Sequence, residues 1–351
     1  MAALSPMMQQ YFDIKKQHPD KILFFRLGDF YEMFYDDAIL ASKELELTLT
    51  GRDCGQEERA PMCGVPFHSY ENYVARLIAK GYKVAICEQM EDPALAKGLV
   101  KRDIIRVVTP GTVIESSMLQ DDKNNYIASI YITEKKAGVC FADVSTGTAH
   151  AAVLTGEKLG PEIISELCRY SPSEVLFNAA ILDYKEVTAY IKQQLACSVE
   201  LLDEAAFAPD ACMEEMRAQF GDAPEKTAGL APESPAFTAL AVLLGYLKET
   251  QKKGVERLKT VHNYAEAQYM QLSPVTRANL ELTETMRGRE KKGTLLWVLD
   301  KTQTAMGKRL MRAWIEQPLV NVAAINARLD GVEELVGDSV ARADIAAALS
   351  K

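Results

Sequence analysis

Apolar residues recur at helical and strand spacings over the first 110 or so residues. The recurrence from Met7 to Ile14, closed by Pro19, predicts a helix over residues 5–19. Similar patterns predict strands near 21–26, 30–34, 82–88 and 103–109, and helices over 36–46 and 69–80. Asp36 and Asp37 are expected to cap the first of these two helices. Residues 50–67, rich in glycine, proline and charge, are expected to form a loop, which completes a compact α+β unit.

A different pattern follows a polar, turn-rich linker at residues 115–124. Three strands joined by short turns are expected at 126–132, 137–144 and 146–154. Helices are then expected at 160–169, 182–194, 203–219 and 235–251, with a short strand at 174–177 and an exposed loop at 221–234. This order of elements predicts an α/β layer.

Beyond residue 256 the periodicity is helical, and we expect a bundle. The predicted helices are 293–301, 304–314, 322–336 and 339–351. Thr304 and Asn321 are expected to be N-caps. At 351 residues the chain is long enough for two or three domains. We therefore predict a multidomain α+β and α/β protein, with domains at 1–114, 125–252 and 256–351, the last of them all-α.

The charge is distributed unevenly along the chain, whose formal net charge is −9. Residues 1–120 sum to about −3, residues 121–250 to about −10 and residues 251–351 to about +4. Proteins that bind DNA usually owe much of their affinity to a basic surface. Contact with DNA would therefore be confined to small patches, or most of the basic surface would lie outside this sequence.

The composition excludes several classes of protein. No apolar run approaches the roughly 18 residues of a membrane span, and the N-terminus lacks the order of a signal peptide. The seven cysteines are scattered and never spaced C-x-x-C, which favours a reducing cytosolic compartment. The four histidines are far apart in sequence, so a zinc site is not expected.

Residues 21–36 carry the most informative local pattern. An apolar run over 21–25 predicts a buried strand, and Gly28-Asp29 predicts a tight turn. Phe30 and Glu32 lie two residues apart, so on an extended chain both point to one face. Two interpretations stay open at this point: a core phenylalanine with a solvated neighbour, or an exposed aromatic and carboxylate that act together.

Ordered blocks of sequence along nearly the whole chain resemble the MutS family of DNA mismatch repair proteins. They lie at residues 25–38, 60–70, 73–81, 84–93, 106–112, 276–283, 304–310 and 314–319. The resemblance implies a mismatch-recognition domain, a connector with a ribonuclease-H-like fold and the beginning of a helical core or lever domain. It also implies that the clamp and the ATPase domain of the family lie outside this sequence.

The resemblance assigns roles to particular residues. Phe30 matches the aromatic that enters the minor groove and stacks on a mispaired or unpaired base, and Glu32 matches the carboxylate that accepts a hydrogen bond from that base. Arg52 and Lys97 are weaker candidates for contacts with the DNA backbone. The implied partners are mismatched double-stranded DNA, a second copy of the chain, and MutL through the connector. The implied location is the bacterial cytoplasm, in association with the nucleoid, with no membrane contact.

No enzymatic activity is expected from these 351 residues. ATP and magnesium belong to the ATPase domain of the family, whose phosphate loop needs a lysine after its second glycine. In Gly288–Thr294 a threonine stands at that place, so this segment is expected to be a basic turn before a helix. No cofactor or metal is expected here.

Two alternatives use the same sequence differently. The chain could be a protein-interaction and connector module without DNA binding of its own. It could also hold a metal-dependent nuclease-like domain, but Asp143 alone on a strand falls short of the clustered carboxylates that such chemistry needs. The sequence does not specify which mismatches are preferred, the oligomeric state, or which connector surface meets a partner.

Overall fold

The computed structural model of this chain describes residues 4–55, 57–91, 98–115, 117–195, 197–252, 254–264 and 269–350. The chain divides into two compact units. The first comprises residues 1–113 and 245–257, and the second comprises residues 114–244 and 258–351. No helix among the described residues is both long enough and apolar enough to span a membrane.

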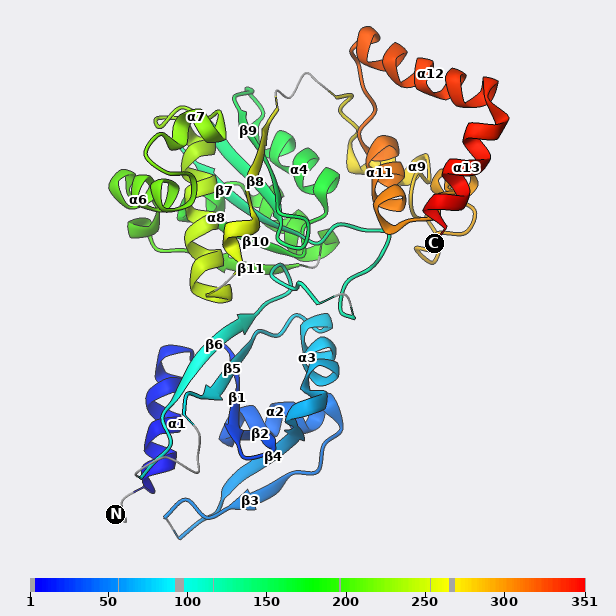
Figure 1. Ribbon diagram of the computed structural model, residues 1–351. Helices are drawn as coiled ribbons and strands as arrows, with labels where there is room; N and C mark the ends of the chain where they lie inside the picture. The colour runs from blue at the N-terminus through cyan, green and yellow to red at the C-terminus, as the bar shows by residue number, and fades with distance from the viewer. Residues whose placement is uncertain are drawn as a thin grey trace. The chain divides into compact units, whose positions relative to one another are not determined.

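A mixed sheet forms the centre of the first unit, and its described strands run in the order β3-β4-β2-β1-β5-β6 (Figure 1). The strands are β1 Ile22–Leu27, β2 Phe30–Phe34, β3 Thr50–Arg52, β4 Ala60–Pro66, β5 Val84–Gln89 and β6 Arg102–Val108. The helices are α1 Pro6–Gln17, α2 Tyr35–Leu45, α3 Tyr70–Ala79 and the short η1 Phe67–Ser69. Strands β1 and β5 are parallel, and the other pairs are antiparallel.

The two faces of this sheet are covered differently. On one face Met8 and Tyr11 of α1 pack with Phe25 and Phe34, and all four are buried. On the other face Tyr31 and Met33 are buried, and helices α2 and α3 lie on that side. Strand side chains point alternately to the two faces, so the sheet has a core on each face. On the face of Phe25 and Phe34, this core extends only as far as α1 does.

Asp37 has a different role from the predicted one. The N-cap of α2 is Phe34, and Asp36 and Asp37 lie in the first turn. The carboxylate of Asp37 accepts hydrogen bonds from Leu23 N and from Lys15 Nζ, both at 2.9 Å. It therefore anchors the helix to β1 and α1, because a nearly buried carboxylate is stable only when it is paired.

The prediction of a loop over 50–67 was wrong, since β3 and β4 lie there. Pro61 and Pro66 stand near the ends of β4, where a missing amide proton costs little. Gly64 is needed for close approach, because a Cβ at this position would lie 3.3 Å from Tyr31 O of β2. Proline and glycine here reflect neighbours in the sheet, although in sequence they resemble a loop.

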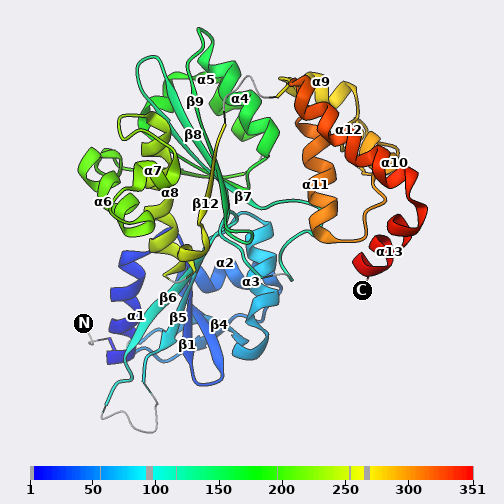
Figure 2. The same ribbon diagram turned by 45° about the horizontal axis from the view of Figure 1, so that its top comes forward.

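The second unit contains the other sheet, in the order β11-β10-β7-β8-β9-β12 among its described strands. Figure 1 labels β7 to β11, and Figure 2 labels β12. The strands are β7 Tyr126–Ile132, β8 Ala137–Asp143, β9 Thr148–Leu154, β10 Glu174–Phe177, β11 Ser198–Leu201 and β12 Thr260–Asn263. Strands β7, β8 and β9 form the predicted antiparallel meander, and β10, β11 and β12 add to it in parallel. The short strands β11 and β12 were not predicted.

Helices cover both faces of the second sheet. They are α4 Leu159–Tyr170, α5 Lys185–Tyr190, α6 Pro209–Phe220, α7 Pro224–Ala228 and α8 Pro235–Gln251, with the short turns η2 Ala179–Asp183, η3 Ile191–Leu195, η4 Glu204–Phe207 and, in the first unit, η5 Val255–Arg257. Helix α4 packs Ile163 and Leu167 against Phe141 and Val175. On the other face α8 starts very close to β8, since a Cβ at Gly138 would lie 1.9 Å from Pro235 O. Helix α7 lies within the predicted loop over 221–234.

The segment after β12 is helical, as predicted. Its helices are α9 Pro274–Asn279, α10 Leu295–Leu299, α11 Ala305–Glu316, α12 Val322–Gly337 and α13 Ser339–Leu349. The predicted caps are confirmed: Thr304 accepts a hydrogen bond from Gly307 N and Asn321 accepts one from Ala324 N, each at 3.0 Å. Within their described residues, α11, α12 and α13 bury no side chain. The predicted mixed α/β and helical architecture is confirmed, but these three helices form no buried bundle core.

Candidate nucleic-acid interface

The hairpin of β1 and β2 is held by a tight turn at Gly28-Asp29, as predicted. Gly28 has a φ of +57°, which glycine adopts without strain. Arg26 Nε donates to Gly28 O at 2.5 Å, and Phe67 N donates to Asp29 O at 2.9 Å. The turn is thus fixed from two sides, so the residue that follows it has a defined position.

Phe30, the first residue of β2, lies outside the core. Its side chain is 46% exposed, whereas Tyr31, Met33 and Phe34 in the same strand are buried. A residue that is nearly half exposed is not part of the buried core of the strand. Of the two interpretations left open by the sequence, the core phenylalanine is therefore wrong.

Phe30 and Glu32 share one face of the sheet. Phe30 lies opposite Leu27 and Pro66, and Glu32 lies opposite Phe25 and Gly64. Paired residues of antiparallel strands point to the same side, so this is the face that α1 covers farther along. Gly64 lies beside both side chains: a Cβ there would be 3.4 Å from Glu32 Cγ and 3.8 Å from Phe30 Cδ1. The absent side chain keeps the surface beside them open.

Glu32 is paired, which the sequence did not predict. Arg52 Nη1 donates to Glu32 Oε2 at 2.5 Å, and the two side chains are 37% and 16% exposed respectively. Strand β3 brings Arg52 to this position through its pairing with β4, in the segment that was expected to be a loop. Lys97, the other candidate for a backbone contact, lies outside the described residues.

A second exposed aromatic lies near the hairpin turn. Phe67 is 38% exposed, and the Arg26 guanidinium lies 3.8 Å from the centre of its ring. Arg26 also pairs with Glu88 at 3.1 Å. Sequence reasoning missed this cluster, because its residues come from strands β1 and β5 and the short helix η1, which the pattern alone does not bring together.

The alternative chemistries have weaker support. Asp143 accepts hydrogen bonds from Asn124 Nδ2 at 2.7 Å and from Ser145 N at 2.9 Å, as a buried structural carboxylate does. Over the described parts of the chain, no group of three or more His, Cys, Asp or Glu side chains could hold a metal ion. Gly288–Thr294 forms the predicted turn, in which Thr294 caps α10 by accepting from Trp297 N.

Comparison with known proteins assigns these regions to one family. Residues 5–117 match the family model of MutS domain I, residues 125–261 match domain II and residues 275–351 match domain III. The chain is 51% identical to the DNA mismatch repair protein MutS of Ruminiclostridium cellulolyticum and 49% identical to that of Acetivibrio thermocellus, each over 98% of this chain. It is 45% identical to the MutS protein of Alkaliphilus oremlandii over 100% of this chain.

The chain spans only 39–40% of the length of these relatives. Within that span the three matches follow one another in order and leave only short stretches between them. The chain belongs to the MutS family of DNA mismatch repair proteins, and its residues match the models of domains I, II and III of that family.

Proposed function

We propose that this chain recognises mispaired or unpaired bases in duplex DNA, and that Phe30 is the residue that enters the duplex. The observation that carries the proposal is the exposure of Phe30 on a rigid strand, directly after a fixed turn and beside the open surface at Gly64. A preorganised aromatic loses little conformational freedom on insertion.

The physics of a mismatch favours such a wedge. A mispaired step stacks poorly and bends easily, so unstacking it costs less than unstacking a matched step. Stacking of a base on an aromatic ring is worth about 1–3 kcal/mol. Phe30 would therefore distinguish a mismatch from matched DNA mainly through the lower cost of opening the duplex there.

The ion pair of Glu32 with Arg52 determines how Glu32 would contact the displaced base. Arg52 engages Oε2, which leaves Oε1 as an acceptor for a proton donor on the displaced base. The positive charge of Arg52 also offsets the repulsion between Glu32 and the DNA phosphates. Arg52 uses one of its five donors on Glu32, so it can still contact a phosphate.

Other parts of the proposal follow from the family. We propose that mismatched DNA, a second copy of the chain and MutL are partners of the full-length protein in the bacterial cytoplasm, near the nucleoid. We expect this chain to hydrolyse no ATP. With a net charge of −9, its own binding to DNA should be weak and sensitive to salt.

The test uses Phe30→Ala, with Ile39→Ala as the matched control. Ile39 is also exposed, at 51%, but it lies on α2 on the other side of the sheet. Anisotropy at low salt would compare a duplex with one unpaired thymine against the matched duplex. Phe30→Ala should lose the preference for the unpaired base, a change of about 5- to 150-fold that corresponds to the stacking free energy.

Ile39→Ala should keep the preference for the unpaired base. The melting temperature of either variant should be at most a few degrees below that of the unaltered chain. If Phe30→Ala keeps its preference, the wedge is assigned to the wrong residue. If the unaltered chain shows no preference for the unpaired base even at low salt, the alternative of an interaction module without DNA binding of its own is favoured.

A further inference from the structure

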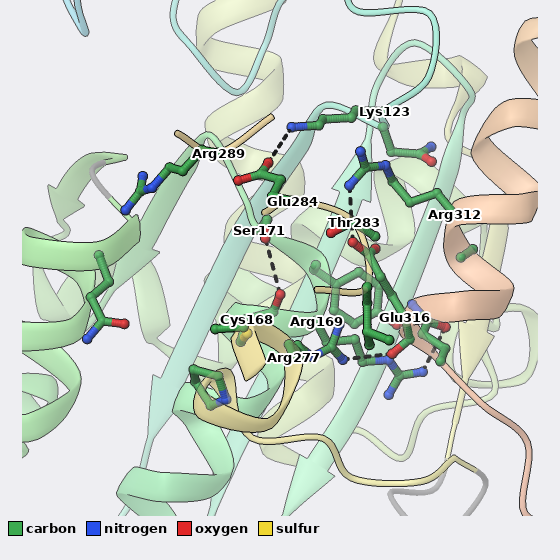
Figure 3. A pocket seen from close by; sticks show the side chains of 18 of the residues that line it. Lys123, Cys168, Arg169, Ser171, Arg277, Thr283, Glu284, Arg289, Arg312 and Glu316 are labelled. Atoms are coloured by element: carbon green, nitrogen blue, oxygen red, sulfur yellow. Dashed lines mark hydrogen bonds and ion pairs between the residues drawn. The ribbon is translucent and has the colours of Figure 1, made fainter. Parts of the chain in front are cut away.

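The second unit encloses a cavity of about 450 Å³ that the proposed recognition of DNA does not use (Figure 3). Its walls come from the end of α4, from α9 and α11, from the segment over 282–289 and from the residues before β7. Pockets that bind small ligands usually measure about 300–1,000 Å³. This cavity is therefore large enough for an organic molecule with several charged groups.

The lining of the cavity is strongly cationic. Among the described residues that line it, six are cationic and two are carboxylates. The cations are Lys123, Arg169, Arg277, Arg289, Arg309 and Arg312, and the carboxylates are Glu284 and Glu316. The surplus is notable because residues 121–250 as a whole sum to about −10.

Three of the six cations already have a carboxylate partner. Lys123 Nζ lies 3.0 Å from Glu284 Oε1, a contact visible in Figure 3. Arg312 Nη1 lies 3.2 Å from Glu316 Oε1. Arg169 is paired at 3.3 Å with Glu166, outside the lining. Both carboxylates of the lining are therefore engaged by these contacts.

The other three cations, Arg277, Arg289 and Arg309, form no ion pair with any carboxylate of the described chain. Arg277 donates to the main-chain oxygens Leu272 O at 3.2 Å and Glu316 O at 2.7 Å. Arg309 Nε donates to Asp121 O at 3.3 Å. Within the described residues these three guanidinium groups therefore form no ion pair with a carboxylate, although Arg277 lies near enough to Glu316 to favour the ionised form of that carboxylate.

Two further observations concern residues of the lining. The Nε atoms of Arg169 and Arg312 are buried and have no hydrogen-bond partner within the described structure, although buried donors are normally satisfied. Burial raises the pKa of Glu316 against the opposing effect of Arg312 and Arg277.

We propose that this cavity binds a small phosphorylated ligand, whose phosphate oxygens are met by Arg277, Arg289 and Arg309. Guanidinium groups form paired hydrogen bonds with phosphate oxygens, which favours a phosphate group over a simple halide ion. Tyr126 and Tyr190 line the same cavity and offer aromatic surface to an organic part of the ligand. The ligand would touch α4 as well as α9 and α11, and so would hold domains II and III of the family together.

The test measures binding of inorganic tripolyphosphate to the 351-residue chain by calorimetry. Arg289→Gln and Arg309→Gln each remove one unpaired charge, and each should weaken binding at least about tenfold, the loss of one charge-assisted contact. The matched controls are Arg287→Gln and Lys308→Gln, which remove one charge from the same segments but at residues outside the lining. Both controls should bind as the unaltered chain does.

A second arm separates a small ligand from a nucleic-acid backbone as the source of the phosphate. The same variants are titrated with matched duplex DNA, for which all four substitutions should have similar small effects. Loss of duplex binding in Arg289→Gln and Arg309→Gln, with tripolyphosphate unaffected, would overturn the proposal in favour of a DNA-contacting surface. Equal tripolyphosphate affinity in all four variants would also overturn it. Phe30→Ala should bind tripolyphosphate normally, so the two proposals fail independently.

Discussion

The strands of the first unit and the helices α11 to α13 both follow regular apolar patterns. Only the strands bury their apolar side chains in a core. In the sheet, Leu23, Phe25 and Phe34 are completely buried. In the helices, Met306 is 74% exposed, Leu329 is 58% exposed and Val340 is 70% exposed. An apolar stripe shows which side of an element is suited to burial, but burial itself requires a partner surface.

The same difference separates Phe30 from its neighbours. The three remaining apolar side chains of β2, Tyr31, Met33 and Phe34, are all buried, so the exposed Phe30 is unusual in its strand. Among α11 to α13 an exposed apolar side chain is the rule and carries no functional meaning by itself. The exposure of Phe30 therefore supports the wedge only together with its fixed position after the Gly28-Asp29 turn.

The largest expected effect compares a core residue of the sheet with an apolar residue of α12. Phe34→Ala should lower the free energy of unfolding of the first unit by about 3–5 kcal/mol, because it removes a buried ring that packs 5.1 Å from the Tyr11 ring. Leu329→Ala should change stability by less than about 0.5 kcal/mol. Urea unfolding of both variants measures the difference, and equal losses would show that α12 is packed after all.

A second expected effect is a loss of roughly 3 kcal/mol in the free energy of unfolding as the pH falls, caused by the packed histidine His150 and compared with an exposed histidine. Burial, followed by the neighbouring His262 and Arg169, lowers the pKa of His150 to about 4. The unfolded chain binds this proton near pH 6.5, so the contribution of neutral His150 is present above pH 6.5 and is lost as pH falls towards 4.

Substituting His150→Asn should therefore flatten the pH dependence of unfolding between pH 6.5 and 4. His68→Asn, at an exposed histidine, is the control for the substitution itself. Stability curves measured by urea titration across this range test the pair. A pH dependence that survives in His150→Asn would assign it to other groups.

The smallest expected effect is a loss of about 2 kcal/mol in the free energy of unfolding when residues 1–113 are produced without the rest of the chain. It belongs to a comparison between a region that folds alone and one that does not. Residues 1–113 should unfold cooperatively when produced alone, since they hold their own core. They should be somewhat less stable than in the whole chain, because Gln251 Nε2 no longer donates to Thr112 O, nor Lys252 Nζ to Ile104 O. Residues 295–350 produced alone should show no cooperative transition in circular dichroism, and a sharp one would contradict the comparison.

Local chemistry was predictable from the sequence wherever the deciding residues are neighbours in the chain. Helix α8 and strand β10 have the predicted bounds, Gly28 forms the predicted turn, and Thr304 and Asn321 cap their helices. The spacing of Phe30 and Glu32 also placed them correctly on one face. Strand β4 was missed because its proline and glycine are explained by partners in the sheet.

The sequence by itself determined most of the helices and strands, the mixed and helical character of the regions and the shared face of Phe30 and Glu32, because these depend on spacing along the backbone. Strands β3, β4, β11 and β12 were missed. Only the tertiary structure decided that Phe30 is exposed, that Arg52 pairs with Glu32 and that six cationic side chains line one cavity. Those facts depend on contacts between segments far apart in sequence, since burial and ion pairing are properties of surfaces that the chain creates only when it folds.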